Sequence, residues 1–469
     1  MITLDVARCL APAVHDHGLD PDLLADDGPG GVAAAELTKR LEASRGTGME
    51  RWRLLAEDPM RAQHLAGVRE VRDRYAGTLR NLVVLGIGGS ALGNIALQAA
   101  LNPPTHNLLP DPQRRSPRLF VLDNADPVLF QGTVDLVAAD DPGFERTLFV
   151  VISKSGETAE TAAQFLIVRD LLQKARGDAH SDRLVAITDP DRGTMRRICD
   201  AAGYATLPVP EGVGGRFSVL SPVGLLSAAL CGIDVETLLE GAAAMEHACR
   251  SERLSENPAA LLATTLVELG ARCGKGVHVM MPYANQLDPM ADWWRQLWAE
   301  SLGKIVPGVQ GTVFAGYTPV KALGATDQHS QVQLYREGPN DKAVIFLEVE
   351  RFASEAPIPV GLGEDALAYL EGASLAQLLA AEKRATEYAL TESRRPNLTI
   401  RLPEINEHTI GEFIMLWQVT TAYAGLMLGV DAYDQPAVEL GKQATFALMG
   451  KPGFEQLRER VEGVPAPSA

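Results

Sequence analysis

The sequence contains little of what several classes of protein require. Its five cysteines are scattered over 469 residues without a C-x-x-C pair, so they predict neither a disulfide framework nor a zinc site. Lys and Arg number only 43 against 60 Asp and Glu, and the net charge of −17 argues against a nucleic-acid-binding or membrane-binding protein. The first 18 residues show no basic stretch followed by an apolar run, which argues against a secretory signal and favours a cytoplasmic location.

Long hydrophobic runs are also scarce, with one exception at residues 413–430. This run has 18 residues without a charge, about the minimum for a membrane-spanning helix. It contains polar side chains such as Gln418, and acidic Glu412 and Asp431 flank it where Lys or Arg would be expected. We therefore predict a buried core helix.

The remaining composition, 46% hydrophobic and 22% charged residues, is that of an ordinary globular chain. Its length predicts roughly two to three domains. From residue 81 onward, short apolar runs alternate with helical patterns, at residues 82–85, 119–122, 148–152, 184–187 and 205–209. Continuous apolar strands between helices predict a parallel sheet covered on both faces, which is a doubly wound α/β domain.

A second, less regular α/β unit is predicted after the polar segment 251–258, which we interpret as an interdomain linker. Its predicted strands are 277–281, 344–349 and 398–402, and its predicted helices include 291–300, 375–390 and 413–430. Helical spacing at 36–43 and 52–75, interrupted by glycines at 28–31, predicts a helical N-terminal segment. The predicted units are 1–75, 76–250, 251–430 and a C-terminal helix and tail at 431–469.

Two loops that follow predicted strands carry features of an anion site. G-I-G-G-S at residues 86–90 lets a ligand approach the backbone, and S-K-S-G-E-T at 153–158 offers hydroxyls, an ammonium and the start of a helix. The first loop could also be a plain strand-to-helix turn. As a dinucleotide fingerprint it has Ala91 in place of the third glycine and lacks the acidic residue at the usual spacing. The second could be a capping box with Ser155 as the N-cap.

The pairing of these two loops resembles the sugar isomerase (SIS) domain, and residues from about 50 to 450 resemble the phosphoglucose isomerase family. The resemblance implies two flavodoxin-like domains with mainly parallel sheets. It also implies interconversion of glucose 6-phosphate and fructose 6-phosphate through a cis-enediol, without a metal or a cofactor. The substrate-binding residues that it implies are Gly89, Ser90, Ser153, Lys154, Ser155, Thr158, Gly215, Gln296 and Gln435.

The glycine-rich segment 211–222 fits the first signature of this family and leaves Arg216 free to point into a cleft. The resemblance implies that Arg216 stabilises the negative charge of the enediolate. Taken alone, Arg216 would more often be a surface residue on a glycine turn.

Glu300 follows Gln296 by four residues, so both lie on one helix face, beside an apolar setting of three tryptophans. The resemblance makes Glu300 the base that moves a proton between C2 and C1. Leu302 stands where the family has a polar residue, and a lone helical Glu would ordinarily be a solvated surface residue.

Two further motifs imply the residues that open the sugar ring. G-A-T-D-Q-H at 324–329 resembles the family segment that carries its catalytic histidine, so His329 would transfer a proton at the ring oxygen. In this family that histidine comes from the neighbouring subunit, which implies a homodimer. Y-D-Q-P-A-V-E-L-G-K at 433–442 resembles the second signature and implies that Lys442 assists His329. Ala437 replaces a glycine there, which would strain the turn if the position needs a positive φ. Without this context, His329 could be structural and Lys442 a surface residue.

Two other functions remain open at the level of sequence. A non-catalytic phosphosugar-binding regulator would be expected to carry a DNA-binding module, and residues 1–75 show no basic recognition helix. An NAD-dependent enzyme would need a better dinucleotide fingerprint. The expected partners are a small phosphosugar and a second copy of the chain.

Overall fold

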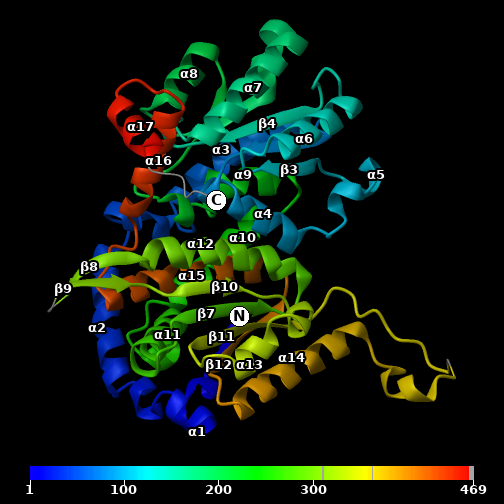
Figure 1. The fold of residues 1–469 in the computed structure, drawn as a ribbon. Helices are drawn as coiled ribbons and strands as arrows, with labels where there is room; N and C mark the ends of the chain where they lie inside the picture. The colour runs from blue at the N-terminus through cyan, green and yellow to red at the C-terminus, as the bar shows by residue number, and fades with distance from the viewer. Residues whose placement is uncertain (309–310, 362, 464–469) are drawn as a thin grey trace.

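The computed structural model describes residues 1–308, 311–361 and 363–463, arranged around two sheets that lie one above the other (Figure 1). The upper sheet has five parallel strands in the order β3-β2-β4-β5-β6. Their bounds are β2 Asn81–Leu85, β3 Arg118–Leu122, β4 Thr147–Ile152, β5 Leu184–Thr188 and β6 Ala205–Pro208. Counted along the chain this is the flavodoxin-like order 2-1-3-4-5, so the predicted doubly wound domain is confirmed.

The buried strands of the upper sheet explain why their sequences are continuously apolar. In β2, Leu82 and Val84 pack into one hydrophobic cluster, while Val83 and Leu85 pack into another on the opposite face. The first face is covered by α3 Met60–Tyr75, α4 Leu92–Leu101 and α9 Pro222–Leu230, and the second by α6 Pro127–Asp140, α7 Ala159–Arg176 and α8 Thr194–Ala202.

The lower sheet has the order β1-β12-β11-β7-β10, with every pair parallel except β1 and β12. Its strands are β1 Thr3–Asp5, β7 Val277–Pro282, β10 Thr318–Lys321, β11 Lys342–Arg351 and β12 Asn397–Glu404. The three predicted strands are present. The short edge strands β1 and β10 were not predicted, and β1 lies in a segment that we expected to be helical throughout. Without β1, the chain order is again 2-1-3-4, so the two units share their topology.

The N-terminal segment differs from its prediction in two further places. The glycines at 28–31 do not interrupt a helix, because α2 Pro29–Ser44 begins there and a Cβ at Gly31 would overlap the carbonyl of Ala25. The predicted helix at 52–75 begins only at Met60 in α3, after the 3-10 turn Gly48–Leu54 and Pro59. Proline before the first helical residue disfavours continuing the helix backward.

The predicted core helix is α15 Glu407–Leu428, which is buried from Thr409 to Gly425 between the two sheets. No helix in the described ranges is long and apolar enough to cross a membrane. The helix α10 Val235–Ala248 packs along α15 so closely that a Cβ on Gly241 would overlap the carbonyl of His408. The helix α10 belongs to the predicted first domain and α15 to the predicted second domain, yet the two pack tightly together. The domain boundary at 250–251 therefore stays a prediction.

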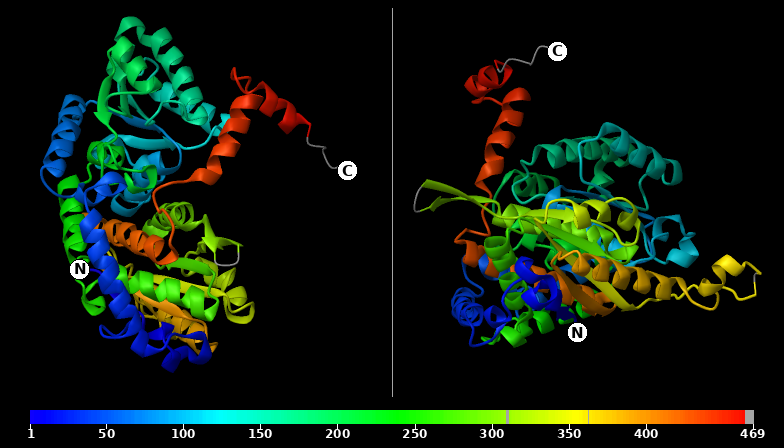
Figure 2. Two further views of the ribbon diagram at one scale, coloured as in Figure 1. Left: turned by 90° about the vertical axis from the view of Figure 1, so that its left-hand side faces the viewer. Right: turned by 60° about the horizontal axis from the view of Figure 1, so that its bottom comes forward.

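The remaining helices are α1 Ala11–Val14, α5 Asp111–Arg114, α11 Pro258–Cys273, α12 Asp288–Leu302, α13 Val332–Glu337, α14 Leu375–Glu392, α16 Glu439–Leu448 and α17 Glu455–Glu462. Figure 2 shows segments that project from the body: the hairpin β8 Lys304–Gly308 with β9 Gly311–Ala315, the stretch between β11 and α14, and α16 with α17. The predicted tail at 464–469 lies outside the described residues.

Candidate active site

The two glycine- and serine-rich loops lie at the same edge of the upper sheet. Strands β2 and β4 are adjacent and parallel, and each loop follows the carboxyl end of its strand. Ligands of open α/β sheets bind at this edge. The first loop forms the 3-10 turn Gly88–Ser90 and leads into α4.

The first loop touches both the arginine loop and helix α12. A Cβ on Gly89 would overlap the carbonyl of Gly215, and a Cβ on Gly88, whose φ is +58°, would lie 2.9 Å from the Nε2 atom of Gln296. Glycine at these positions therefore lets segments from both sheets meet, and it brings together three of the predicted substrate-binding residues: Gly89, Gly215 and Gln296.

The second loop holds its shape through its own hydroxyls. Ser153 Oγ accepts from the N–H of Gly156 at 3.0 Å, and Ser155 Oγ accepts from the N–H of Glu157 at 3.1 Å. Because α7 begins at Ala159, the N-cap residue is Thr158, whose side chain caps no N–H. The alternative in which Ser155 is the N-cap is therefore wrong.

Lys154 and Ser155 are exposed at this edge. The Lys154 ammonium has no hydrogen-bond or ion-pair partner among the residues that the structure describes. Its charge and the serine and threonine O–H donors are therefore available to an anion at the start of α7, where the helix dipole also favours negative charge.

Arg216 lies in the 3-10 turn Gly215–Phe217 and is almost completely buried. Its Nε donates to Ser301 Oγ at 2.7 Å, and its Nη2 donates to the carbonyls of Ala432 at 2.6 Å and Asp434 at 2.9 Å. Its Nη1 donates to Gln435 Oε1 at 3.0 Å. Burial lowers the pKa of this guanidinium, and the nearby Glu300 carboxylate opposes that effect. One side chain thus joins the arginine loop, helix α12 and residues 432–435.

The carboxylate of Glu300 forms an ion pair with Arg216. Its Oε1 lies 3.4 Å from Arg216 Nη1, and its Oε2 accepts from Gln296 Nε2 at 3.0 Å. The Glu300 side chain is 27% exposed, so it can be reached from solvent. The two residues that were predicted from the same helix face therefore do meet.

The helix under Glu300 is fixed by aromatic packing. Trp294 and Trp298 of α12 contact Trp417 of α15, with ring centroids 5.3 and 5.7 Å apart. Leu302 is fully buried in the same core. An apolar residue at the position where the family has a polar one therefore fits its surroundings.

Lys304 also belongs to this site, although it is not among the predicted site residues. Its Nζ donates to the carbonyls of Glu300 at 2.8 Å and Ser301 at 2.9 Å, and it lies 3.5 Å from Asp434 Oδ1. Burial, followed by the charge of Arg216, lowers the pKa of this ammonium. Lys304 thus satisfies carbonyls at the end of α12 and neutralises negative charge there.

A cavity of about 610 Å³ opens beside these residues. Its polar wall includes Glu300, Lys304, Asp434 and Gln435, and its apolar wall includes the hairpin residues Ile305 and Phe314 together with Ala437. Ala437 lies in the 3-10 turn Pro436–Val438 and does not have a positive φ, so the expected strain at this position is absent.

The structure of one chain does not bring His329 and Lys442 to Glu300. His329 ends the 3-10 turn Thr326–His329, is exposed, and has no side-chain hydrogen bond among the described residues. Lys442 is exposed on α16, where its Nζ contacts Glu439 Oε1 at 2.8 Å. The ring-opening roles of both residues stay predictions.

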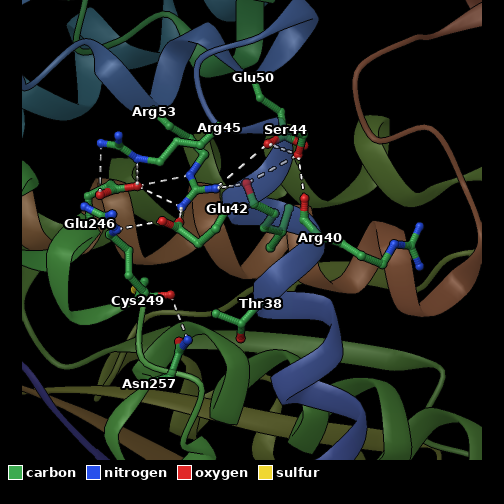
Figure 3. Close-up of polar contacts among 12 residues, drawn as sticks. Thr38, Arg40, Glu42, Ser44, Arg45, Glu50, Arg53, Glu246, Cys249 and Asn257 are labelled. Atoms are coloured by element: carbon green, nitrogen blue, oxygen red, sulfur yellow. Dashed lines mark hydrogen bonds and ion pairs between the residues drawn. The ribbon is translucent and has the colours of Figure 1, made fainter.

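A buried network of ion pairs among arginine and glutamate side chains lies next to the site (Figure 3). The Nη2 atom of Arg53 donates to Glu246 Oε1 at 2.8 Å and to Glu42 Oε1 at 2.7 Å, and Arg45 Nε donates to Glu246 Oε1 at 2.9 Å. Burial opposes the charge of Arg53, but Glu246 and Glu42 raise its pKa above the ordinary value. This N-terminal network had no predicted role.

The network is connected to the site by three aromatic rings that pack against one another. Trp52, next to Arg53, packs on Phe217 at 5.0 Å between ring centroids, and Phe217 packs on Tyr433 at 5.3 Å. Burial, together with the nearby Glu50, raises the pKa of Tyr433 well above its ordinary value. Because Phe217 follows Arg216 and Tyr433 precedes Asp434, these rings hold both loops that the guanidinium joins.

These features define a doubly wound α/β protein with ammonium and hydroxyl donors and a paired arginine and glutamate at the carboxyl edge of its first sheet. The profile of the phosphoglucose isomerase family matches residues 68–457. The chain belongs to this family.

Relatives agree with this placement, and solved structures share the fold. The chain is 48% identical to the glucose-6-phosphate isomerase of Carboxydothermus hydrogenoformans over 84% of its length and 83% of the relative, and 44% identical to that of Rubrobacter xylanophilus over 92% and 97%. A crystal structure of a hypothetical protein from Thermus thermophilus matches with a TM-score of 0.82 and 35% identity, covering 96% of this chain and all of that one. The glucose-6-phosphate isomerase structure from Chlamydia trachomatis shares the fold, with a TM-score of 0.76 and 22% identity over 98% of this chain and 91% of that one.

The ion network behind the site yields a stability prediction. Glu246→Gln leaves the buried Arg53 without its full countercharge, so we expect the free energy of unfolding to fall by about 3 kcal/mol or more. Urea unfolding followed by circular dichroism measures the change. The matched control is Glu236→Gln on the same helix, which removes an exposed ion pair with Arg69 and should change stability by less than about 1 kcal/mol. Equal effects of the two substitutions would contradict the assigned role of the network.

Proposed function

We propose that this protein interconverts glucose 6-phosphate and fructose 6-phosphate through a cis-enediol intermediate. The observation that carries the proposal is the contact of Arg216 with Glu300 at the sheet edge where the two predicted sugar-phosphate loops lie. Membership of the phosphoglucose isomerase family supports it, since the two relatives described above are named glucose-6-phosphate isomerases. The fold alone would not distinguish an enzyme from a binding protein.

The phosphate would be bound by the loop 153–158. The ammonium of Lys154 and the hydroxyls of Ser153, Ser155 and Thr158 supply donors, and the start of α7 supplies a favourable dipole. Ser90 would lie near the sugar, with the backbones of Gly89 and Gly215 allowing close approach. Gln296 and Gln435, which hydrogen-bond Glu300 and Arg216, would line the remainder of the binding site.

Once the ring is open, Glu300 would remove the proton from C2 of the aldose and return it to C1. Between these steps the substrate is an enediol or enediolate whose oxygen carries negative charge. Arg216 is already fixed by neutral acceptors and lies 3.4 Å from the base, so its charge can stabilise that oxygen without reorganising. No redox cofactor is needed for this step, because the two carbons exchange oxidation states within one molecule.

Ring opening would be carried out by His329, assisted by Lys442, with His329 supplied by a second copy of the chain. His329 is exposed and has no side-chain hydrogen bond to any residue that the structure describes, which supports this arrangement. Large apolar side chains on the projecting segments, including Ile305, Phe314, Leu440 and Met449, are also exposed. Such surfaces commonly mark a protein–protein interface. We therefore propose a homodimer.

The non-catalytic regulator is the less favoured alternative. A binding protein has no need for a carboxylate held between Gln296 and a buried guanidinium. The two relatives described above align with most of this chain, and both are named glucose-6-phosphate isomerases.

Substitution of the proposed base tests the reaction. Glu300→Gln preserves the size and one acceptor of the side chain but cannot take up a proton, so we expect kcat to fall by about 10²–10⁴-fold. A coupled assay of fructose 6-phosphate conversion without added metal measures it, and mannose 6-phosphate tests the selectivity at C2. Glu36→Gln on the exposed face of α2 is the control. Near-normal turnover of Glu300→Gln would remove Glu300 from the mechanism.

Mixing two inactive variants tests whether His329 crosses a subunit interface. In a mixed dimer of Glu300→Gln and His329→Ala, one site combines Glu300 of one chain with His329 of the other, so activity should return. Each variant alone should be nearly inactive. Differently tagged chains, coexpressed and purified through both tags, provide the mixed dimer. If purified mixed dimers stay inactive, the two residues act within one chain and the proposed arrangement is wrong.

A further inference from the structure

A second group of cationic side chains lies at the opposite edge of the upper sheet, near the amino ends of β2, β3 and β4. It surrounds a cavity of about 230 Å³. The charged side chains lining it are Arg72, Arg114, Arg115, Arg146 and a single carboxylate, Asp111. Because β2 has five residues, this edge lies roughly 16 Å along the strand from the proposed active site. In Figure 1, α5 marks this side of the sheet, away from α16 and α17.

One carboxylate serves several guanidinium groups in this cluster. Asp111 pairs with Arg114 at 2.5 Å and lies 3.8 Å from Arg80 and 3.7 Å from Arg146. Partial burial opposes ionisation of Asp111, but the three arginines, Arg114 first, lower its pKa below the ordinary value. The Nε and Nη1 atoms of Arg114 donate to the carbonyls of Ser116 at 2.8 Å and Leu109 at 2.6 Å, so this side chain holds the local backbone in place. Two further carboxylates compensate other members: Asp73 pairs with Arg72 at 2.8 Å, and Asp140 lies 3.5 Å from Arg80. The positive charge that lacks a close countercharge of its own is therefore that of Arg115 and Arg146.

Several donors in the cluster have no acceptor. The Arg115 guanidinium is exposed and forms no hydrogen bond or ion pair within the described ranges. Arg146 has no side-chain hydrogen bond there, since its contact with Asp111 is longer than one. The neighbouring Arg80 does not line the cavity; its Nε atom is buried without a hydrogen-bond partner, and its Nη2 atom lies 3.5 Å from Asp140. Arg115 also ends α5 with a φ of +61°, a left-handed position where glycine or asparagine is usual. An arginine with free donors thus stands where a smaller residue would be favoured by the backbone.

We propose that this cavity binds a small anion that carries a phosphoryl group. Guanidinium groups donate paired N–H bonds to phosphate oxygens, and a tetrahedral phosphoryl group can accept such bonds from several directions at once. A planar carboxylate matches one guanidinium well but several less well. The volume is below that of typical sites for drug-sized ligands, so the cavity suits inorganic phosphate, pyrophosphate or a short phosphate ester better than a nucleotide.

Calorimetric titration with pyrophosphate tests the site. All proteins carry Ser155→Ala and Thr158→Ala, which weaken anion binding at the proposed active site without involving the arginine cluster. On this background, Arg115→Glu with Arg146→Glu should raise the Kd for pyrophosphate by about tenfold or more, since charge-assisted hydrogen bonds are replaced by repulsion. Arg40→Glu is the matched control, because Arg40 is exposed on α2 and its guanidinium points away from other labelled groups in Figure 3.

Further arms of the experiment keep the outcome decisive. Arg115→Ala removes only a free guanidinium and should weaken binding without disturbing the fold. Titration with succinate at the same ionic strength should give a much higher Kd than pyrophosphate. Equal pyrophosphate affinity in the double arginine variant and in Arg40→Glu would overturn the site, and succinate binding as tight as that of pyrophosphate would overturn the phosphoryl assignment. Arg115→Glu with Arg146→Glu, made in the otherwise unmodified chain, should retain isomerase activity, so this test is independent of the proposed reaction.

Discussion

The buried guanidinium of Arg216 is the interaction on which the proposed active site depends. It lies in a loop that follows the first sheet, yet its partners are Ser301 and Glu300 of α12 and the segment 432–435. These three parts of the chain are separated by many residues and meet only in the folded protein. Their joint position is fixed because a buried guanidinium must find acceptors for all its donors. The same guanidinium therefore both positions the carboxylate of Glu300 and supplies its countercharge.

The packing behind Arg216 explains why so many residues far from the site are needed. The rings of Trp52, Phe217 and Tyr433 connect the arginine loop to the Arg53 network, and Trp417 holds α12 from the other side. A displacement of either layer would change the distance between Arg216 and Glu300. The N-terminal helices and α15 therefore act as a rigid support for the proposed chemistry rather than as a cover for the sheets.

Much of the fold could be predicted because its signals are local. The central strands of the first sheet alternate between two hydrophobic clusters, as Leu82 and Val83 do, and so they are apolar throughout. The edge strands β1 and β10 are short and only partly buried, so they lack this signal.

The residues of the site also divide into those with a local sequence signal and those without one. Gln296 with Glu300, and the loops 86–90 and 153–158, follow from spacing along the chain. The ion pair of Arg53 with Glu246 joins residues 193 positions apart and leaves no pattern in the sequence. The position of His329 relative to the substrate cannot be determined from one chain if the groups that it contacts belong to a second copy.

The net charge of −17 and an anionic substrate are compatible because charge acts locally. At physiological ionic strength the field of exposed charges decays over about 8 Å, so a few cations close to the ligand outweigh distant carboxylates. Lys154, Arg216 and Lys304 provide this local charge at the carboxyl edge of the first sheet.

The central claim is that Glu300, held by Arg216, moves a proton between C2 and C1. The most direct test uses glucose 6-phosphate deuterated at C2, converted in ordinary water while the label is followed by NMR in the sugar and in the solvent. A deuteron held on a carboxylate that is partly open to solvent can exchange, so the account predicts that some label reaches C1 of fructose 6-phosphate and some is lost to water. Complete transfer of the label to C1, with none in the water even at slow turnover, would indicate a hydride shift and would contradict the account.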